Sequence, residues 1–319
     1  MPNHLQKISY ISLMPTIRCN FQCQSCFNWK VPATLELPLV EWEKIVASLI
    51  KNFDGSTFVE INGGEPLLRR DDIIQIVRKL KTHFQKVVLN TNGYFLDPNT
   101  IDALEAAGLD VIKMSLYSLN PTTHNDLRGA VAFDQAMQAL RYHQEKNSAM
   151  EFRIAILITS KNIQEVPALI DYLVGLRNVV IRLNALTEIY NSEKSADLSV
   201  YKIPEALWPK AEAIEKVFEC IMAHKDKIKT TEEHLKTIKE YYLNPASALE
   251  HPCRVHESSL IITSDGKVSL CYKLPPFGDA RGDLAQLLDS PEAEAQRTAT
   301  KHCRKGCRIL ACNFINQAN

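Results

Sequence analysis

The sequence predicts an α/β fold, an open (β/α)6 partial TIM barrel followed by a small C-terminal cysteine-rich domain. Strand-like and helix-like patterns alternate six times before about residue 185, at a spacing of roughly 25–35 residues that is close to the size of a βαβ unit. Six units are fewer than the eight that close a barrel, so we expect one open side. Beyond about residue 250 the pattern changes to short strands, turns and five of the nine cysteines.

The six expected strands are largely apolar runs, and they cover residues 8–13, 57–62, 86–91, 110–117, 151–159 and 178–183. The helices between them are expected at 38–50, from 71 onward, and at 99–107, 133–144 and 163–173. Trp42, Ile45 and Leu49 illustrate the helical spacing of the apolar residues. Two more helices are expected at 204–222 and 231–242, after a polar loop at 191–199.

The C-terminal domain is expected to begin near residue 250, which divides the chain into 1–250 and 251–319. Ser264-Asp265-Gly266 separates two short apolar runs at 259–263 and 267–271, a pattern that predicts a β-hairpin. A short helix is expected at 284–288, and cysteines follow it.

Lysine and arginine together number 37, as do aspartate and glutamate, so the formal net charge is zero. Such a chain has no overall attraction to nucleic acid or to an anionic membrane, and neither is expected as a partner. The apolar run at 8–14 is too short for a signal sequence or a membrane span. We therefore expect a cytoplasmic, thiol-reducing location, where an odd number of cysteines indicates metal binding rather than disulfides.

Cys19, Cys23 and Cys26 form a C-x3-C-x2-C cluster directly after the first expected strand. A closed four-iron cluster takes four protein thiolates, and a structural zinc ion also takes four ligands. Three cysteines leave one metal position open, where a substrate or cofactor can bind. The alternatives are three unrelated buried cysteines, or a zinc knuckle that borrows a distant fourth ligand.

Gly63-Gly64-Glu65-Pro66 follows the second expected strand, and together with the cysteine cluster it resembles the radical S-adenosylmethionine (SAM) superfamily. The resemblance implies a 4Fe–4S cluster on Cys19, Cys23 and Cys26 whose open iron is chelated by SAM. One electron, from a donor such as flavodoxin or ferredoxin, would release methionine and a 5′-deoxyadenosyl radical that abstracts hydrogen from an unactivated C–H bond. The family usually has an aromatic residue where Ser25 stands, and Phe27 is the nearest substitute.

The same resemblance implies residues that bind SAM. Gly63 and Gly64 would leave room for the methionine amino group, with Glu65 beside it, although an isolated Gly-Gly-Glu is more often a plain turn. Ser115 and Arg128 match the strand serine and loop arginine that hold the ribose and carboxylate, and Asn92 begins a recurrent turn. A surface arginine that caps a helix is the alternative for Arg128.

The spacing of Cys253 and Cys271 around Gly266 resembles the start of a SPASM or twitch domain, which binds auxiliary iron–sulfur clusters. Cys303, Cys307 and Cys312 follow at a spacing that differs from the full SPASM pattern. Five thiols can fully ligate one four-iron cluster but not two, so we expect the shortened twitch version with one auxiliary 4Fe–4S cluster. A zinc site on the same thiols is the alternative.

Polar residues interrupt the predicted strands, whereas strands of a helix-covered parallel sheet are usually apolar throughout. If these faces point inward, they line a polar cavity; the residues are Glu60, Asn62, Lys113, Ser115, Tyr117, Arg153, Arg182 and Asn184. We therefore expect a polar substrate.

The expected function is a SPASM/twitch-type radical SAM oxidoreductase or isomerase that acts on a polar small molecule or a peptide, by oxidation, cross-linking or rearrangement. The first strand starts within ten residues of Met1, which favours a small molecule or a peptide delivered by a separate protein. An epimerase with Cys220 or a surplus C-terminal thiol as hydrogen donor is one alternative, although a core position is expected for Cys220. A zinc- or cluster-binding interaction protein without catalysis is another.

Overall fold

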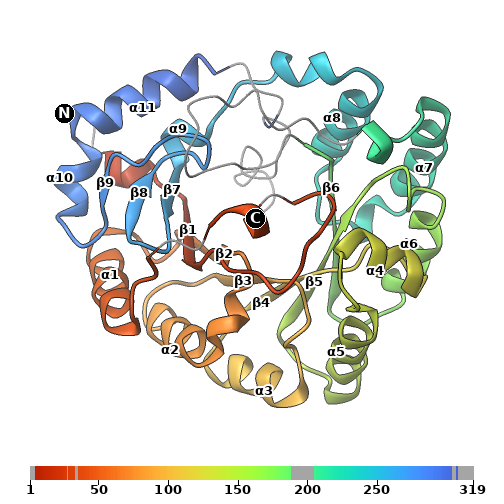
Figure 1. Cartoon of the computed structure of the whole chain (residues 1–319), viewed down its shortest axis with the longest axis horizontal. Helices are drawn as coiled ribbons and strands as arrows, with labels where there is room; N and C mark the ends of the chain where they lie inside the picture. Colours follow the sequence, from red (N-terminus) through yellow and green to blue (C-terminus); the bar gives the residue numbers. More distant parts are fainter. Residues whose placement is uncertain (1–3, 27, 33–34, 188–204, 304–306, 308–319) are drawn as a thin grey trace.

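One continuous sheet organises the protein, and its strands β1 to β6 are all parallel. The computed structural model describes residues 4–26, 28–32, 35–187, 205–303 and 307. Figure 1 shows the sheet curving around the centre of the molecule. The six strands confirm the prediction and are β1 (Tyr10–Thr16), β2 (Phe58–Gly63), β3 (Val87–Thr91), β4 (Val111–Ser115), β5 (Glu151–Leu157) and β6 (Val179–Asn184).

Helices cover the outside of the sheet, as expected for a partial barrel (Figure 1). The helices that alternate with the strands are α1 (Leu39–Asn52), α2 (Arg70–Leu80), α3 (Pro98–Ala106), α4 (Pro121–Arg128), α5 (Phe133–Lys146) and α6 (Val166–Val174). Helix α1 shows why they form: Trp42, Ile45 and Leu49 recur every three or four residues and are fully buried. Each such side chain stabilises the fold by roughly 1.5–3 kcal/mol.

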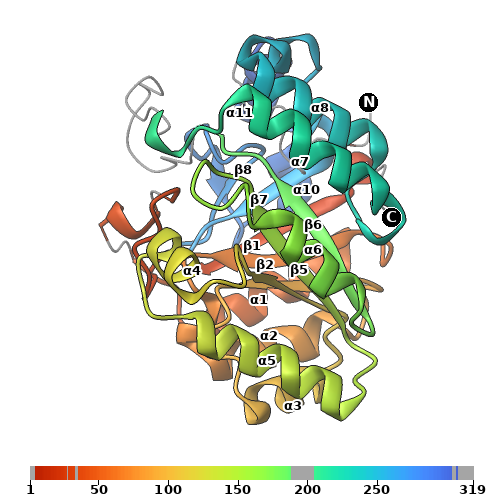
Figure 2. The same ribbon diagram turned by 90° about the vertical axis from the view of Figure 1, so that its right-hand side faces the viewer.

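Two helices, α7 (Ala211–Ala223) and α8 (Glu232–Leu243), follow the last parallel strand and pack together on one side of the molecule (Figure 2). The predicted start of the first one at residue 204 is wrong. A 3-10 turn at Glu205–Leu207 comes first, and Pro209 disfavours helical geometry at Trp208, so the helix begins beyond the proline. The loop expected at 191–199 lies outside the described residues.

Helix α4 occupies a stretch that the sequence prediction treats as a loop. The side chain of Asn120 caps its start by accepting a hydrogen bond from the Thr122 amide, and Gly129 ends it in the left-handed conformation. The same kind of cap, Ser290 before Pro291, begins the equally unpredicted α11 (Pro291–Lys301). Both helices are polar, so their apolar periodicity is weak, but their capping residues could have indicated them.

The C-terminal strands extend the barrel sheet. Strand β7 (Ser259–Ile262) pairs in parallel with β1, and β8 (Lys267–Ser269) and β9 (Gly278–Asp279) continue antiparallel. The predicted hairpin and the predicted helix α10 (Leu284–Leu288) are confirmed, and a short α9 (Val255–Ser258) precedes β7. The sheet thus crosses the domain boundary that we predict near residue 250. Within the described ranges, no helix has the length and apolar character that a membrane span requires.

Candidate active site

A cavity of about 350 Å³ opens among the ends of the parallel strands, where α/β barrels place their active sites. All three clustered cysteines line it, and so do most of the residues predicted to bind a cofactor: Gly63, Gly64, Asn92, Ser115 and Arg128. Ser25 also faces it, whereas Phe27 lies outside the described residues. The predicted inward polar faces are confirmed for Glu60, Asn62, Lys113, Ser115, Tyr117 and Asn184, which all line the cavity.

The cysteine loop follows β1 and is held in place by α4. The Gln24 amide donates to the Leu127 carbonyl at 3.1 Å, and the Gln24 side chain donates to the Asp126 carbonyl at 2.9 Å. Figure 2 shows α4 beside the segment that follows β1. Burial raises the pKa of Cys19 to about 11, because a thiolate is poorly solvated there.

Gly63 and Gly64 allow the end of β2 to approach closely the backbone that leads into the cysteine loop. Gly63 has a φ of +129°, and a Cβ there would lie 2.1 Å from the Thr16 carbonyl oxygen. A Cβ on Gly64 would lie 2.1 Å from the Arg18 carbonyl oxygen. Both glycines line the cavity, but the close approach that demands glycine comes from the chain itself; their contact with SAM stays a prediction.

We expect Gly64→Ala to lower the free energy of unfolding by about 3 kcal/mol or more, because neighbouring backbone must move to admit the methyl group. The displaced loop should also hold less iron. Urea unfolding and iron analysis after anaerobic reconstitution measure the two effects. Gly175→Ala is the matched control, since its nearest neighbour, the Tyr172 oxygen, is 3.6 Å away. Equal iron content and unfolding midpoint in both variants would contradict the prediction.

Glu65 is fully buried and does not line the cavity. Its carboxylate accepts hydrogen bonds from the Leu67 amide at 3.0 Å, the Thr91 hydroxyl at 2.8 Å and the Asn92 amide at 2.7 Å. The Asn92 side chain in turn donates to Asn20 Oδ1 at 2.8 Å. The side chain of Glu65 therefore ties β2 to β3 and, through Asn92, to the cysteine loop, a connection that local sequence patterns do not reveal.

Arg128 lies at the end of α4 and is only 6% exposed, so the alternative of a surface helix cap is wrong. Its guanidinium lies over the rings of Phe21 and Tyr117, at 5.4 and 5.0 Å from their centroids, and donates to the Tyr117 hydroxyl at 3.0 Å. Its buried Nε has no hydrogen-bond partner in the described part of the chain. Burial opposes its charge, but Cys23 and Tyr117 outweigh that effect and raise its pKa.

A second group of thiols gathers in the C-terminal part. Cys253, Cys271, Cys303 and Cys307 form no disulfides and are close enough to influence one another electrostatically. Burial raises the pKa of Cys271 to about 11 and that of Cys307 to about 12. Four thiols suit one four-iron cluster. The fifth predicted ligand, Cys312, lies outside the described residues.

Two protein-family models match the chain. The model of the radical SAM superfamily covers residues 13–173, which is half of the sequence. The chain belongs to the radical SAM superfamily. A second model, the iron–sulfur cluster-binding SPASM domain, covers residues 253–313. The superfamily uses SAM and a 4Fe–4S cluster, and the SPASM domain binds auxiliary iron–sulfur clusters, so the predicted family and the types of cofactor are confirmed. A single auxiliary cluster stays a prediction.

Related proteins include GTP 3′,8-cyclases. A probable GTP 3′,8-cyclase of Saccharolobus islandicus is 36% identical over 124 residues, which span 39% of this chain and 39% of that protein. Another, from Sulfurisphaera tokodaii, is 27% identical over 79% of this chain and 77% of its own length. The GTP 3′,8-cyclase of Peptoclostridium acidaminophilum is 24% identical over 88% and 84%, respectively.

Solved radical SAM structures share the fold. Streptococcus suis SuiB bound to S-adenosylmethionine aligns with a TM-score of 0.71 and 18% identity, over 97% of this chain and 74% of SuiB. Native anSMEcpe with bound AdoMet aligns with a TM-score of 0.67 and 16% identity, over 94% and 87%. Identities this low support the partial-barrel fold and leave the substrate open.

The residues of this radical SAM protein fit its cofactors. The thiols of Cys19, Cys23 and Cys26 share one cavity, and the unpartnered Nε of Arg128 is buried beside them. Thiolates are the usual cluster ligands, and a guanidinium suits a carboxylate such as that of SAM. As placed, no three metal-ligating side chains within the described ranges stand close enough to hold a metal ion. The fit therefore rests on ligand chemistry and on the shared cavity.

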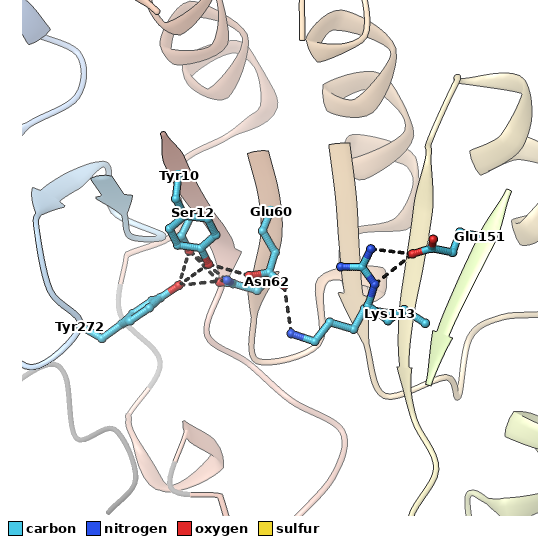
Figure 3. A network of polar contacts seen from close by, with 8 residues as sticks. Tyr10, Ser12, Glu60, Asn62, Lys113, Glu151 and Tyr272 are labelled. Atoms are coloured by element: carbon cyan, nitrogen blue, oxygen red, sulfur yellow. Dashed lines mark hydrogen bonds and ion pairs between the residues drawn. The ribbon is translucent and has the colours of Figure 1, made fainter. Parts of the chain in front are cut away.

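A buried carboxylate, that of Glu60, lines the radical SAM cavity (Figure 3). The Tyr10 hydroxyl donates to it at 2.6 Å, and the Lys113 amino group donates at 3.2 Å. Burial alone would raise the pKa of Glu60, but Lys113 and the bond from Tyr10 hold it below its usual value. Glu60 is therefore ionised at neutral pH.

Tyr272 joins the auxiliary thiols to this cavity, because it follows Cys271 directly and its ring lines the cavity. Its hydroxyl donates to Ser12, and the Asn62 side chain donates back to it at 3.0 Å. Ser12 and Asn62 are hydrogen-bonded to each other, so the three side chains form a closed hydrogen-bond network (Figure 3). Among the described lining residues, Tyr272 alone comes from beyond residue 250.

Cys220 does not take part in the radical SAM cavity. It is half-buried on α7, near Asp171 of α6, and is not among the lining residues. The predicted core position is therefore only partly correct. The structure gives no support to Cys220 as a hydrogen donor to a substrate in this cavity.

We expect the free energy of unfolding to fall at acidic pH because of His124, which is fully buried beside Arg128. The Tyr117 amide donates to its Nδ1 at 3.2 Å, so the ring is neutral, and burial and then Arg128 lower its pKa to about 3. In the unfolded chain, histidine binds a proton near pH 6.5. The contribution of the neutral His124 ring to the free energy of unfolding is therefore complete above that pH and is lost progressively toward pH 3. The loss at pH 5 amounts to about 2 kcal/mol.

Urea unfolding of the wild type and of His124→Asn at pH 7.5 and pH 5 measures this contribution. The variant should lose about 2 kcal/mol less than the wild type between the two pH values, because asparagine does not titrate. An equal loss in both proteins would show that His124 is not the group responsible.

Proposed function

We propose that this protein reductively cleaves SAM and uses the resulting 5′-deoxyadenosyl radical to abstract hydrogen from a C–H bond of a polar small molecule or a peptide. The observation that carries the proposal is the lining of one cavity. The three cysteines, the glycine pair, Asn92, Ser115 and Arg128 line it together with polar strand residues such as Glu60 and Lys113, and apolar residues such as Leu157 complete the lining. Oxidation, cross-linking or rearrangement would follow hydrogen abstraction.

In this scheme, residues of the chain bind SAM and orient it. Arg128 pairs with the SAM carboxylate, since its buried cation has no carboxylate partner in the part of the chain the structure describes. Ser115 and Asn92 supply hydrogen bonds at the ends of β4 and β3. When bound together with a reduced cluster, SAM would supply the radical. A one-electron donor such as flavodoxin or ferredoxin would provide the electron.

The properties of the cavity favour a substrate whose modified group is small and polar, either a small molecule or the side chain of a peptide. SAM takes up part of this cavity of about 350 Å³, and the polar strand residues Glu60, Asn62 and Lys113 line the same cavity, which favours a polar group of limited size. The related GTP 3′,8-cyclases carry the name of a nucleotide substrate. SuiB has been solved with its precursor peptide SuiA, so the shared fold is compatible with either class.

Anaerobic reconstitution with iron and sulfide tests the proposal. We expect about eight irons per chain, four for the SAM cluster and four for a single auxiliary cluster. Reduction with dithionite in the presence of SAM should then yield 5′-deoxyadenosine and methionine, measured by mass spectrometry. Stoichiometric zinc without iron, or an iron-loaded protein that leaves SAM intact, would contradict the enzymatic function. About twelve irons would contradict the single auxiliary cluster.

A further inference from the structure

A continuous row of polar side chains crosses the inner face of the barrel, and the proposed function leaves its ligand open (Figure 3). All five members line the cavity, and they are Lys113, Glu60, Tyr10, Tyr272 and Asn62. We call these five residues the polar row. Lys113 precedes Ser115 by two residues on β4, so it lies about 7 Å nearer the start of the strand than the serine predicted to bind SAM.

Short polar contacts connect the members of the polar row one after another. The Lys113 amino group donates to Glu60 Oε1 at 3.2 Å, and the Tyr10 hydroxyl donates to the other carboxylate oxygen at 2.6 Å. The hydroxyl oxygens of Tyr10 and Tyr272 lie 3.3 Å apart, and the Asn62 side chain donates to the Tyr272 hydroxyl at 3.0 Å. The polar row therefore holds a series of donors and acceptors in fixed positions along the cavity.

The fold itself does not require this row. Strands of a helix-covered parallel sheet are usually apolar. The side chains of Lys113 and Glu60 are only 18% and 12% exposed, and a buried ion pair is often less stabilising than apolar residues of the same volume. Local departures of this kind from the most stable choice are typical of functional sites.

The charges of the polar row balance within the row. A carboxylate or phosphate at the Glu60–Lys113 pair would be repelled by Glu60, and an amine would be repelled by Lys113. Among the described lining residues, Arg128 is the remaining charged side chain apart from the cysteines, and it is assigned to the SAM carboxylate. A neutral ligand meets neither repulsion.

A hydroxyl group fits this ion pair in size and in hydrogen bonding. An oxygen about 2.8 Å from both Lys113 Nζ and Glu60 Oε1 completes a triangle on their separation of 3.2 Å. It can accept from the ammonium, which has three donors, and donate to the carboxylate, which has room for about four hydrogen bonds. An amide would need two atoms, correctly spaced, to make the same two bonds.

We propose that the polar row binds hydroxyl groups of the substrate, and that the substrate is a polyol or a sugar derivative. The proposal rests on the function proposed above and narrows its substrate class. One hydroxyl would bridge Lys113 and Glu60, and further hydroxyls of the same molecule would bond to Tyr272 and Asn62. Because Tyr272 follows Cys271 directly, the part of the chain that carries the auxiliary thiols would help to determine which substrate binds.

Saturation-transfer NMR of the reconstituted protein with SAM bound tests the proposal without knowledge of the substrate. The hydroxyl probes are myo-inositol and D-ribose, and the comparison probes are malonate, putrescine and acetamide, all at equal concentration and ionic strength. We expect a saturable signal with inositol or ribose and little or none with the comparison probes. Tighter binding of malonate would indicate an acid, of putrescine an amine and of acetamide an amide, and each result would overturn the proposal.

Variants show whether the probes bind at the polar row. Tyr272→Phe keeps the ring and loses the hydroxyl, so the apparent affinity for the hydroxyl probe should fall about fivefold. Glu60→Leu combined with Lys113→Met replaces the ion pair by apolar side chains; the affinity should fall about tenfold or more, and the Tm should be equal or higher. Tyr142→Phe is the matched control, because the Tyr142 hydroxyl bonds to Asp102 outside the cavity, and it should bind the probes like the wild type.

The proposal is wrong if neither inositol nor ribose binds to the wild type, or if Tyr272→Phe binds them as tightly as Tyr142→Phe does. Formation of 5′-deoxyadenosine from SAM by the wild type under dithionite, without any probe, reports separately on the proposed function. If SAM stays intact, the proposed function fails, whatever the probes show. If SAM is cleaved but no hydroxyl probe binds, only the assignment of the polar row fails.

Discussion

Replacement of Cys23 by alanine is expected to abolish the reductive cleavage of SAM and to remove about four irons per chain. Cys23 is buried against Phe21 and lines the cavity with Cys19 and Cys26. Two remaining thiols leave a second iron without a protein ligand, and the cluster does not persist. Iron analysis and the yield of 5′-deoxyadenosine under dithionite measure the two losses.

Two further cysteine variants show whether the effect is specific to this site. Cys271→Ala should also lose about four irons, because Cys271 belongs to the auxiliary thiols, but should still cleave SAM. Cys220→Ala should keep all the iron and the full rate, since Cys220 lies outside the cavity. If Cys23→Ala retains SAM cleavage, or if Cys220→Ala loses it, the assignment of the three clustered cysteines is wrong.

Replacement of Arg128 by methionine should weaken SAM binding about 100-fold, or about 3 kcal/mol, because a buried guanidinium bonded to a carboxylate is lost. The methionine side chain can still pack between Phe21 and Tyr117, the rings over which the guanidinium now lies. The free energy of unfolding without SAM should therefore fall by only about 1 kcal/mol, since the packing is kept and the hydrogen bond to the Tyr117 hydroxyl is lost. Equilibrium dialysis against labelled SAM and urea unfolding measure these two quantities.

Arg128→Lys separates charge from geometry at this position. Lysine keeps the positive charge but cannot form two parallel hydrogen bonds to one carboxylate, so an intermediate affinity for SAM is expected. Unchanged affinity in Arg128→Met would show that the arginine does not contact SAM. A large loss of stability in both variants would indicate that Arg128 mainly supports the cysteine loop.

The sequence was sufficient to predict the six parallel strands, because each is an apolar run of strand length separated from the next by a helix-length segment. It also predicted which strand residues face the cavity, since side chains alternate along a strand. Glu60 and Asn62 therefore had to share a face. Among the predicted inward residues, Arg153 and Arg182 are buried but do not line the cavity.

Features that depend on distant pairings could not be predicted in the same way. The carboxylate of Glu65 binds groups on β3, and only the folded chain shows that these contacts turn it away from the cavity. The burial of Arg128 likewise depends on α4, whose polar sequence lacks a clear apolar stripe. The position of Tyr272 inside the barrel follows from the pairing of β7 with β1, which no local pattern encodes.

This pairing has a consequence for how the protein is made. Tyr10 is the register partner of Ser259, so one side of β1 stays unpaired until the segment around residue 259 has left the ribosome. Such non-local pairing slows folding, and an exposed strand edge invites association with other chains. A chain truncated near residue 250 should therefore aggregate, and the nascent protein should depend on chaperones more than its compact final sheet suggests.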